Sequence, residues 1–105
     1  MNLGFIGTGN IVSDVITGIS KSKFSYKKII ISPRNKKKAQ YLKKKFKRIV
    51  IAKDNQEVID MSDWAFLGVL PQVGENILPK LNFKKNQTVI SFMSTTNYSK
   101  LKRLI

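Results

Sequence analysis

The chain contains no cysteine and no histidine among its 105 residues. Without cysteine it forms no disulfide and no thiolate metal site, and without histidine it has neither a typical zinc site nor a histidine-based catalytic triad. We therefore expect no metal. The chain also has no apolar stretch long enough to span a bilayer, and no basic residues precede its apolar start as they would in a signal peptide. We expect a cytoplasmic protein with no membrane partner.

Acidic residues are scarce, with six against 20 lysines and arginines, which gives a net charge of +14. A lysine-rich, arginine-poor composition can reflect coding bias alone. Such a field also attracts polyanions non-specifically and speeds the approach of a phosphorylated cofactor. Nucleic acid is disfavoured as a partner, because the lysines are spread over several predicted elements and the aromatic residues lie mostly at core-type positions.

The first sixteen residues contain the most informative pattern. An apolar run over 3–6 enters a glycine turn at 7–9, and the turn opens into a segment whose apolar residues fall on one side of a helix. Strand, glycine turn and helix follow in the order of a dinucleotide-binding motif. A pyrophosphate binds the exposed N–H groups of a helix start only where no Cβ blocks its approach.

Two glycines match this requirement, because Gly7 allows the tight turn and Gly9 the close approach. A third small residue normally follows three positions later, but this chain has Val12, so the motif is incomplete. Glycine pairs also form ordinary turns. The position of this pair between an apolar strand and an amphipathic helix favours a phosphate site over an ordinary turn.

A second informative site follows the predicted strand 27–32. A domain that binds NAD usually has an acidic residue about 20 positions after the glycines, where it accepts the ribose hydroxyls. Here no acid occurs between Asp14 and Asp54, and the strand leads into Ser32, Arg34 and three lysines. A hydroxyl and a guanidinium suit a 2′-phosphate, so NADP(H) is favoured over NAD(H) as the cofactor. The alternative is that these cations form a solvated helix start.

The rest of the chain alternates between strand and helix patterns. This rhythm predicts a parallel sheet with right-handed crossovers and helices on both faces. We expect a Rossmann-type, doubly wound α/β fold with strand order 3-2-1-4-5 and the cofactor over the carboxyl ends of the strands. The predicted strands cover 3–6, 27–32, 48–52, 64–70 and 88–93, and the predicted helices include 10–19, 35–46 with Asn35 as N-cap, and short segments near 55–59, 73–81 and 98–105.

Four motifs together resemble the N-terminal domain of pyrroline-5-carboxylate reductase. They are GFIGTGN at 4–10, ISPR at 31–34, KDN at 53–55 and FLGVLPQ at 66–72. The similarity extends over essentially all 105 residues. The glycine turn and the arginine are also shared with other NADP-dependent dehydrogenases, of the 6-phosphogluconate and hydroxyisobutyrate types, which remain an alternative.

The resemblance implies a reductase that passes hydride from NAD(P)H to the imine carbon of a pyrroline carboxylate, which makes proline. It implies that the pyrophosphate lies on the glycine turn, the adenosine phosphate on the end of strand 27–32, and the nicotinamide beside strand 64–70. No catalytic residue is named in this domain, because the nicotinamide supplies the chemistry. The implied cofactor-binding residues are Gly7, Thr8, Gly9, Asn10 and Ile11 for the pyrophosphate, Ser32 and Arg34 for the adenosine phosphate, Asn55 for the ribose, and Val69, Leu70 and Pro71 for the nicotinamide side.

Three positions depart from the family pattern. The family usually has Ala at Val12, Lys at Leu70 and a small Ala-Ala-Gly where this chain has Met93-Ser94-Thr95. Side chains larger than Ala-Ala-Gly at the last of these sites would crowd the nicotinamide. An inactive or regulatory member, or a non-catalytic module that binds a nucleotide or nucleic acid, is therefore an alternative.

The family also has a helical C-terminal domain that holds the substrate pocket and the subunit interface. We expect residues 1–105 to be the dinucleotide-binding domain without that C-terminal part. The imine substrate would then bind only in the complete protein, and a homo-oligomer would form only through the missing domain.

Overall fold

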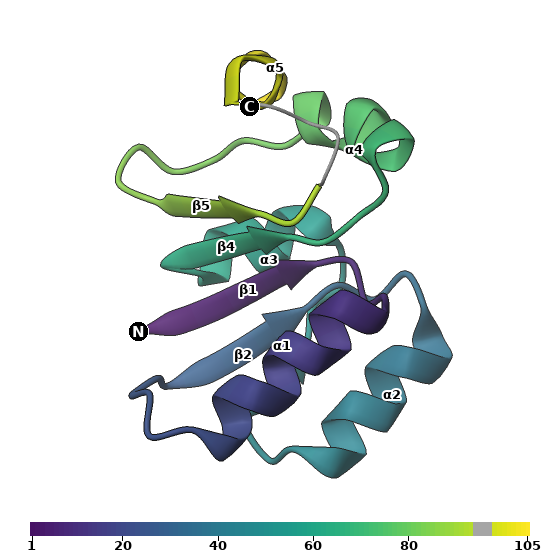
Figure 1. Cartoon of the computed structure of the whole chain (residues 1–105), viewed down its shortest axis with the longest axis vertical. Helices are drawn as coiled ribbons and strands as arrows, with labels where there is room; N and C mark the ends of the chain where they lie inside the picture. The colour runs from purple at the N-terminus through teal and green to yellow at the C-terminus, as the bar shows by residue number, and fades with distance from the viewer. Residues whose placement is uncertain (94–97) are drawn as a thin grey trace.

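A five-stranded parallel sheet forms the centre of the protein (Figure 1). The structure is a computed structural model that describes residues 1–93 and 98–105. The strand order is β3-β2-β1-β4-β5 and every pair is parallel, which confirms the predicted topology. The strands are β1 (Asn2–Ile6), β2 (Lys28–Ile31), β3 (Ile49–Ile51), β4 (Trp64–Leu67) and β5 (Thr88–Ser91).

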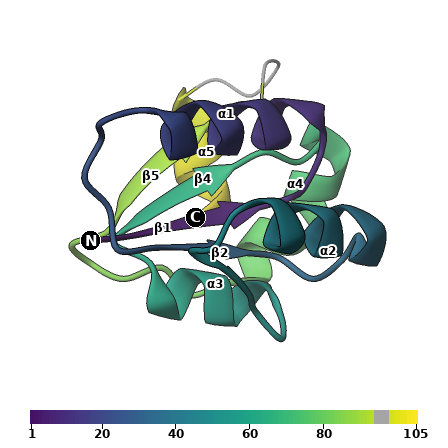
Figure 2. The same ribbon diagram turned by 90° about the horizontal axis from the view of Figure 1, so that it is seen from below.

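Helices cover both faces of this sheet, and Figure 2 shows α1 and α3 on opposite sides of it. Buried side chains of α1 and α2 pack in one cluster against one face, around the stacked rings of Phe5 and Phe66, whose centroids are 4.5 Å apart. Those of α3 and η1 pack in a second cluster against the other face. The helices are α1 (Asn10–Lys21), α2 (Lys36–Lys45), α3 (Asn55–Met61), α4 (Pro71–Ile77) and α5 (Tyr98–Leu104), with the 3₁₀ helix η1 (Leu78–Lys80). None of the described helices is long and apolar enough to cross a membrane.

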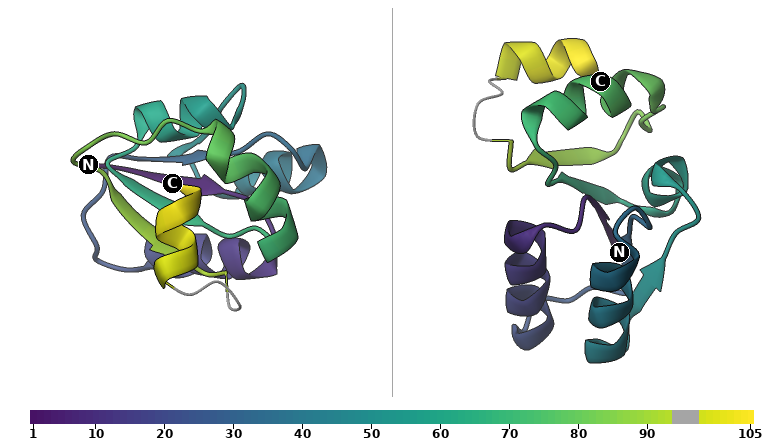
Figure 3. Two further views of the ribbon diagram at one scale, coloured as in Figure 1. Left: turned by 90° about the horizontal axis from the view of Figure 1, so that it is seen from above. Right: turned by 90° about the vertical axis from the view of Figure 1, so that its right-hand side faces the viewer.

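The last two α-helices lie beside each other at the β5 end of the sheet (Figure 3). An ion pair between Lys100 and Glu75 links α5 to α4. Leu101 and Leu104 of α5 are partly buried against the second cluster. The helix predicted near 98–105 is therefore present, and two of its leucines pack inward.

Local sequence explains where most of the elements begin. Asn35 is the N-cap of α2 and accepts a hydrogen bond from the N–H of Lys38 at 3.2 Å, as predicted. Asp54 caps α3 in the same way through the N–H of Glu57. Strand β4 ends at Leu67 rather than at the predicted Leu70, because its pairing with β1 and β5 ends with Ile6 and Ser91, which lie beside Leu67.

The parallel register brings the carboxyl ends of the central strands together. Ile6 of β1 lies beside Leu67 of β4, and Leu67 lies beside Ser91 of β5. The arrowheads in Figure 1 accordingly point to one edge, where α1, α2 and α4 begin. Any site formed by these loops lies at this edge.

Candidate functional site

The turn after β1 depends on the glycine at position 7. Gly7 has φ of 100°, in the region that favours glycine. A Cβ at this position would lie 2.5 Å from the carbonyl oxygen of Gly68. The N–H of Gly7 donates a hydrogen bond to Oγ of Ser32 at 3.0 Å. The segments that follow β2 and β4, on either side of β1, therefore hold this turn in place.

Gly9 differs from Gly7, because nothing in the fold requires a glycine there. Its φ is −71°, which any residue adopts, and a Cβ built on it would meet no atom of the described residues within 4 Å. Gly9 is the N-cap of α1, whose first turn contains no acidic residue and receives no side-chain cap. The exposed N–H groups of this helix start thus face open space, which a Cβ would partly fill.

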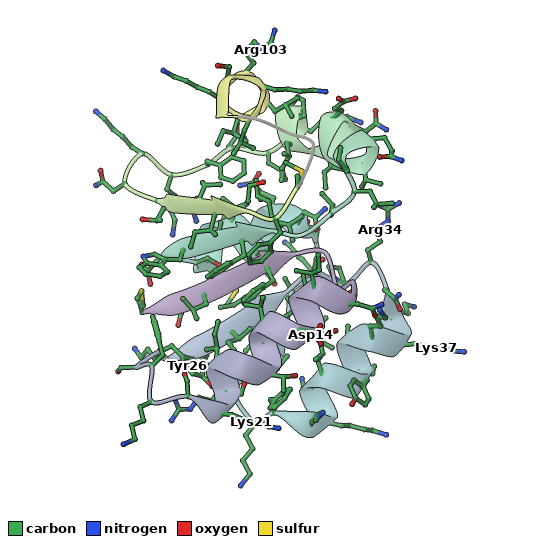
Figure 4. The ribbon with its side chains drawn as sticks, viewed as in Figure 1. Asp14, Lys21, Tyr26, Arg34, Lys37 and Arg103 are labelled. Carbon is green, nitrogen blue, oxygen red and sulfur yellow. The ribbon has the colours of Figure 1, made fainter. Side chains whose placement is uncertain are left out.

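A basic cleft of 710 Å³ opens beside the glycine turn. Three cations from the end of β2 and the start of α2 line it together with the turn: Arg34, Lys36 and Lys37. Figure 4 shows Arg34 and Lys37 at the same edge of the molecule. Within the described residues 1–93 and 98–105, no acidic residue lines this cleft, whose other lining residues are Gly7, Thr8, Gly9, Asn35, Gly68, Val69, Leu70 and Val73.

The start of α2 concentrates positive charge where a helix favours negative charge. Its first turn contains three lysines and no acid, although the helix macrodipole makes this end positive. The ammonium of Lys38 donates a hydrogen bond to Oδ1 of Asn10 at 2.9 Å, which joins the starts of α2 and α1. Two helix N-termini and three cations therefore meet at the cleft, and no acidic residue is among its described lining residues. Such a site suits a ligand with several negative charges.

A second, apolar hollow of 270 Å³ lies on the other side of the glycine turn. It shares Gly9, Gly68, Val69 and Leu70 with the basic cleft, so the two hollows adjoin. None of its lining residues is charged, and the remaining ones are Asn10, Ile11, Pro71, Phe92 and Met93. Ile11 and Leu70 are 59% and 64% exposed, which is unusual for large apolar side chains. This hollow suits a flat, weakly polar ring.

The large side chain of Val12 is compensated by a small residue, Gly68, in the loop after β4. Val12 is fully buried, and its Cγ2 atom lies 2.2 Å from where a Cβ of Gly68 would stand. The small residue that lets α1 approach the sheet is therefore Gly68 of the β4 loop rather than residue 12. The helix reaches the sheet as the motif requires, with the large and small partners exchanged.

A similar exchange accommodates Met93. Its side chain is 4% exposed, and its sulfur lies 2.7 Å from where a Cβ of Gly74 in α4 would stand. Much of its bulk is thus received by α4, although Met93 still lines the apolar hollow. Ser94 and Thr95, the other two residues of this departure, lie outside the described residues.

Most of the predicted cofactor-binding residues line the two hollows, but two of them do not. Ser32 is only 2% exposed, and it holds the glycine turn rather than lining the cleft. Asn55 begins α3 and lines neither hollow. Their predicted contacts with the adenosine phosphate and the ribose stay predictions. The sequence did not predict that Gly68 and Val73 line the cleft. Gly68 lies within the motif FLGVLPQ and Val73 directly follows it, but neither has a feature of its own that indicates a binding role.

Possible metal ligands do not cluster here. Among the residues that the structure describes, no group of three or more acidic side chains gathers in a way that would hold an ion. The site therefore offers hydrogen-bond donors and cations, which suit an organic anion.

Comparisons with known proteins agree with the fold. The family described as NADP oxidoreductase, coenzyme F420-dependent, matches residues 2–95. A solved structure of 1-pyrroline-5-carboxylate reductase from the human pathogen Streptococcus pyogenes is 30% identical in sequence, with a TM-score of 0.82. The match covers 99% of this chain and 38% of that one. A search of curated proteins found no match.

Proposed function

The chain belongs to the family of coenzyme F420-dependent NADP oxidoreductases, and from this premise we propose that it binds NADP(H) across the two hollows. The pyrophosphate lies at the start of α1, the adenosine end in the basic cleft, and the nicotinamide in the apolar hollow. Gly9 and the loop 68–70 line both hollows and would contact the middle of the dinucleotide.

The observation that carries this proposal is the open space at Gly9. Neither backbone conformation nor packing calls for glycine at this position. A phosphate that approaches the N–H groups of α1 does require a residue without a Cβ. The amides from Gly9 to Ile11 would then hold the pyrophosphate oxygens, as the resemblance implies.

The charge of the basic cleft supports NADP(H) over NAD(H). A 2′-phosphate adds negative charge where Arg34, Lys36 and Lys37 line the wall and no carboxylate is present to accept a ribose hydroxyl. Arginine is the best placed of the three in chemical terms, because its planar guanidinium binds phosphate oxygens in pairs.

We further propose that the complete protein reduces a cyclic imine, as in a pyrroline-5-carboxylate reductase. Bound NADPH would supply the hydride, and residues 1–105 would orient it. The similar reductase is a longer protein, since the match covers only 38% of its chain. In this proposal the imine pocket and the subunit interface are provided by a helical domain outside these residues.

A fluorescence titration with NADPH at low salt tests the cofactor site. We expect the wild-type chain to bind NADPH, and the substitution Gly9→Ala to weaken binding at least tenfold, because the new methyl group stands where the phosphate approaches. Alanine is a somewhat poorer N-cap than glycine, so the free energy of unfolding should change by less than about 1 kcal/mol.

Gly18→Ala is the matched control, since Gly18 lies on the same helix and a Cβ there also meets nothing within 4 Å. This variant should bind NADPH as the wild type does. A folded wild-type chain without affinity for NADPH would overturn the proposal. Unchanged binding by the Gly9 variant would overturn the placement of the pyrophosphate.

A further inference from the structure

Three hollows follow α2 from its first turn to the loop beyond its last. The basic cleft lies at the N-terminal end, with Lys36 and Lys37 in its wall. The same two lysines line a separate hollow along the side of the helix, with Tyr41 and Lys44, which is distinct from the apolar hollow described above. A third hollow, of 500 Å³, lies beyond the C-terminal end. None of the three has an acidic residue in its lining.

The side of α2 presents an alternation of cation, aromatic ring and cation. Lys37, Tyr41 and Lys44 are spaced by four and three residues, which places them on one face of the helix. The two lysines are therefore about 10 Å apart along the axis, with the ring between them. Tyr41 is 57% exposed. This face has the composition of a surface that binds phosphates and stacks on bases.

A neighbouring cation contacts the Tyr41 ring. The ammonium of Lys45 donates a hydrogen bond to the Tyr41 hydroxyl at 3.2 Å and lies 5.4 Å from the ring centroid. The ring is thus restrained although it is exposed. A restrained ring loses less conformational freedom when a base stacks on it.

More cations gather in the third hollow. Arg48 packs its guanidinium over the Tyr26 ring at 5.0 Å and donates a hydrogen bond to the Tyr26 carbonyl oxygen at 2.9 Å. Lys23 and Lys47, both exposed, line the same hollow. Figure 4 shows Tyr26 and Lys37 on opposite sides of the molecule, and cations line hollows near both ends of α2.

The lysines of α2 are not neutralised by carboxylates of the protein. In the part of the chain that the structure describes, no lysine of this helix forms an ion pair. The helix macrodipole explains lysines in the last turn, because cations stabilise that end. It explains neither the lysines of the first turn nor the exposed ring of Tyr41.

Although the sequence disfavoured nucleic acid as a partner, Tyr41 is exposed among the lysines of α2, and we propose that this surface, from the basic cleft along α2 to the third hollow, binds single-stranded nucleic acid. Its lysines contact phosphates and Tyr41 stacks on an unpaired base, which a duplex would not offer. We call this surface, with Lys23, Lys37, Tyr41, Lys44, Lys47 and Arg48 as its main residues, the α2 track. Lys37 lines both the basic cleft and this track, so the two sites adjoin, but the proposal does not rest on cofactor binding.

Fluorescence anisotropy with a labelled dT12 oligomer tests the proposal on the purified chain, without any dinucleotide present. The track variant is K23Q/K44Q/K47Q. Because each phosphate contact contributes about 0.7 to the salt slope for single strands, three lost contacts should lower the slope of log K against log salt by about 2. The same relation gives a loss of affinity of roughly 100-fold at 0.1 M salt.

The matched control is K80Q/K85Q/K102Q, which removes the same number of charges from η1, the turn before β5, and α5. All six lysines are exposed, so both variants should fold. We expect the control to bind dT12 within a fewfold of the wild type. Equal losses in the two variants would overturn the proposal, because binding would then follow overall charge.

Tyr41→Ala separates stacking from charge, and it should fold because alanine favours a helix. Loss of one stacked base should weaken dT12 binding about 5- to 100-fold with little change in the salt slope. Unchanged affinity in this variant, or equally tight binding of a duplex, would overturn the assignment to single strands. Binding to phosphatidylserine vesicles but not to dT12 would overturn it in favour of a lipid surface.

Discussion

The exchange between Val12 and Gly68 leads to a quantitative prediction about packing at the switch point. An alanine at position 68 would place its Cβ 2.2 Å from Cγ2 of Val12, whereas its next nearest neighbours are at 3.7 Å. Gly7 is the one glycine of the described residues with positive φ, so backbone strain does not add to the cost at Gly68. We expect Gly68→Ala to destabilise the fold by about 1–3 kcal/mol through overpacking.

The cost of Gly68→Ala should depend on residue 12. Val12→Ala alone removes two buried methyl groups and leaves a cavity, which should cost about 2–3 kcal/mol. In that background the methyl group added at position 68 enters the vacated space, so Gly68→Ala should cost nothing or stabilise slightly. The coupling free energy should therefore be about 1–3 kcal/mol.

Urea unfolding followed by tryptophan fluorescence measures this cycle, because Trp64 is the one tryptophan and is half-buried in β4. For a domain of this size, each 1 kcal/mol corresponds to about 4–8 °C in Tm. Gly18→Ala is the control for a glycine replaced on an open helix face, and it should stabilise by about 0.5–1 kcal/mol. If Gly68→Ala costs the same in the wild type and in the Val12→Ala background to within about 0.5 kcal/mol, the packing argument is refuted.

Two further predictions concern the end of β2. Arg34→Gln should weaken NADPH binding about 10- to 100-fold through the loss of a charge-assisted hydrogen bond and leave NADH binding unchanged, as measured by parallel titrations; an equal loss for both cofactors would contradict a role on the 2′-phosphate. Ser32→Ala should lower the free energy of unfolding by about 1–3 kcal/mol, because the N–H of Gly7 loses the oxygen that it binds at 3.0 Å. Urea unfolding measures this loss, and stability equal to that of the wild type would show that the hydrogen bond contributes nothing.

The parts of the fold that depend on local sequence could be predicted. The glycine turn, the N-cap at Asn35 and the alternation of strands with helices all have short-range signals, and the dinucleotide-binding motif then indicates the strand order of a doubly wound fold. The same holds for the cluster of cations after β2, because the fold places that loop beside the glycine turn.

The contacts between distant segments could not be predicted. The glycine motif calls for a small residue at position 12, but the space for the Val12 side chain comes from Gly68, a residue far away in the sequence. Ser32 is a similar case: its predicted contact with the adenosine phosphate stays a prediction, but the hydrogen bond that its Oγ accepts from the N–H of Gly7 could not be foreseen. Packing partners of this kind follow from the register between strands, which a single sequence does not display.

The electrostatics of the basic cleft connect stability with binding. The starts of α1 and α2 have no acidic residue, and three lysines occupy the first turn of α2 against the macrodipole. Each lysine in this turn lowers the free energy of unfolding of the free chain by a few tenths of a kcal/mol or more. A bound dinucleotide phosphate would attract these lysines and so turn their contribution into a favourable one. Because the cations lie at an exposed edge, salt weakens both the repulsion and the attraction. A dinucleotide at about 100 times its Kd should stabilise the fold by about 2.7 kcal/mol, and the concentration needed to reach that value should rise steeply with ionic strength.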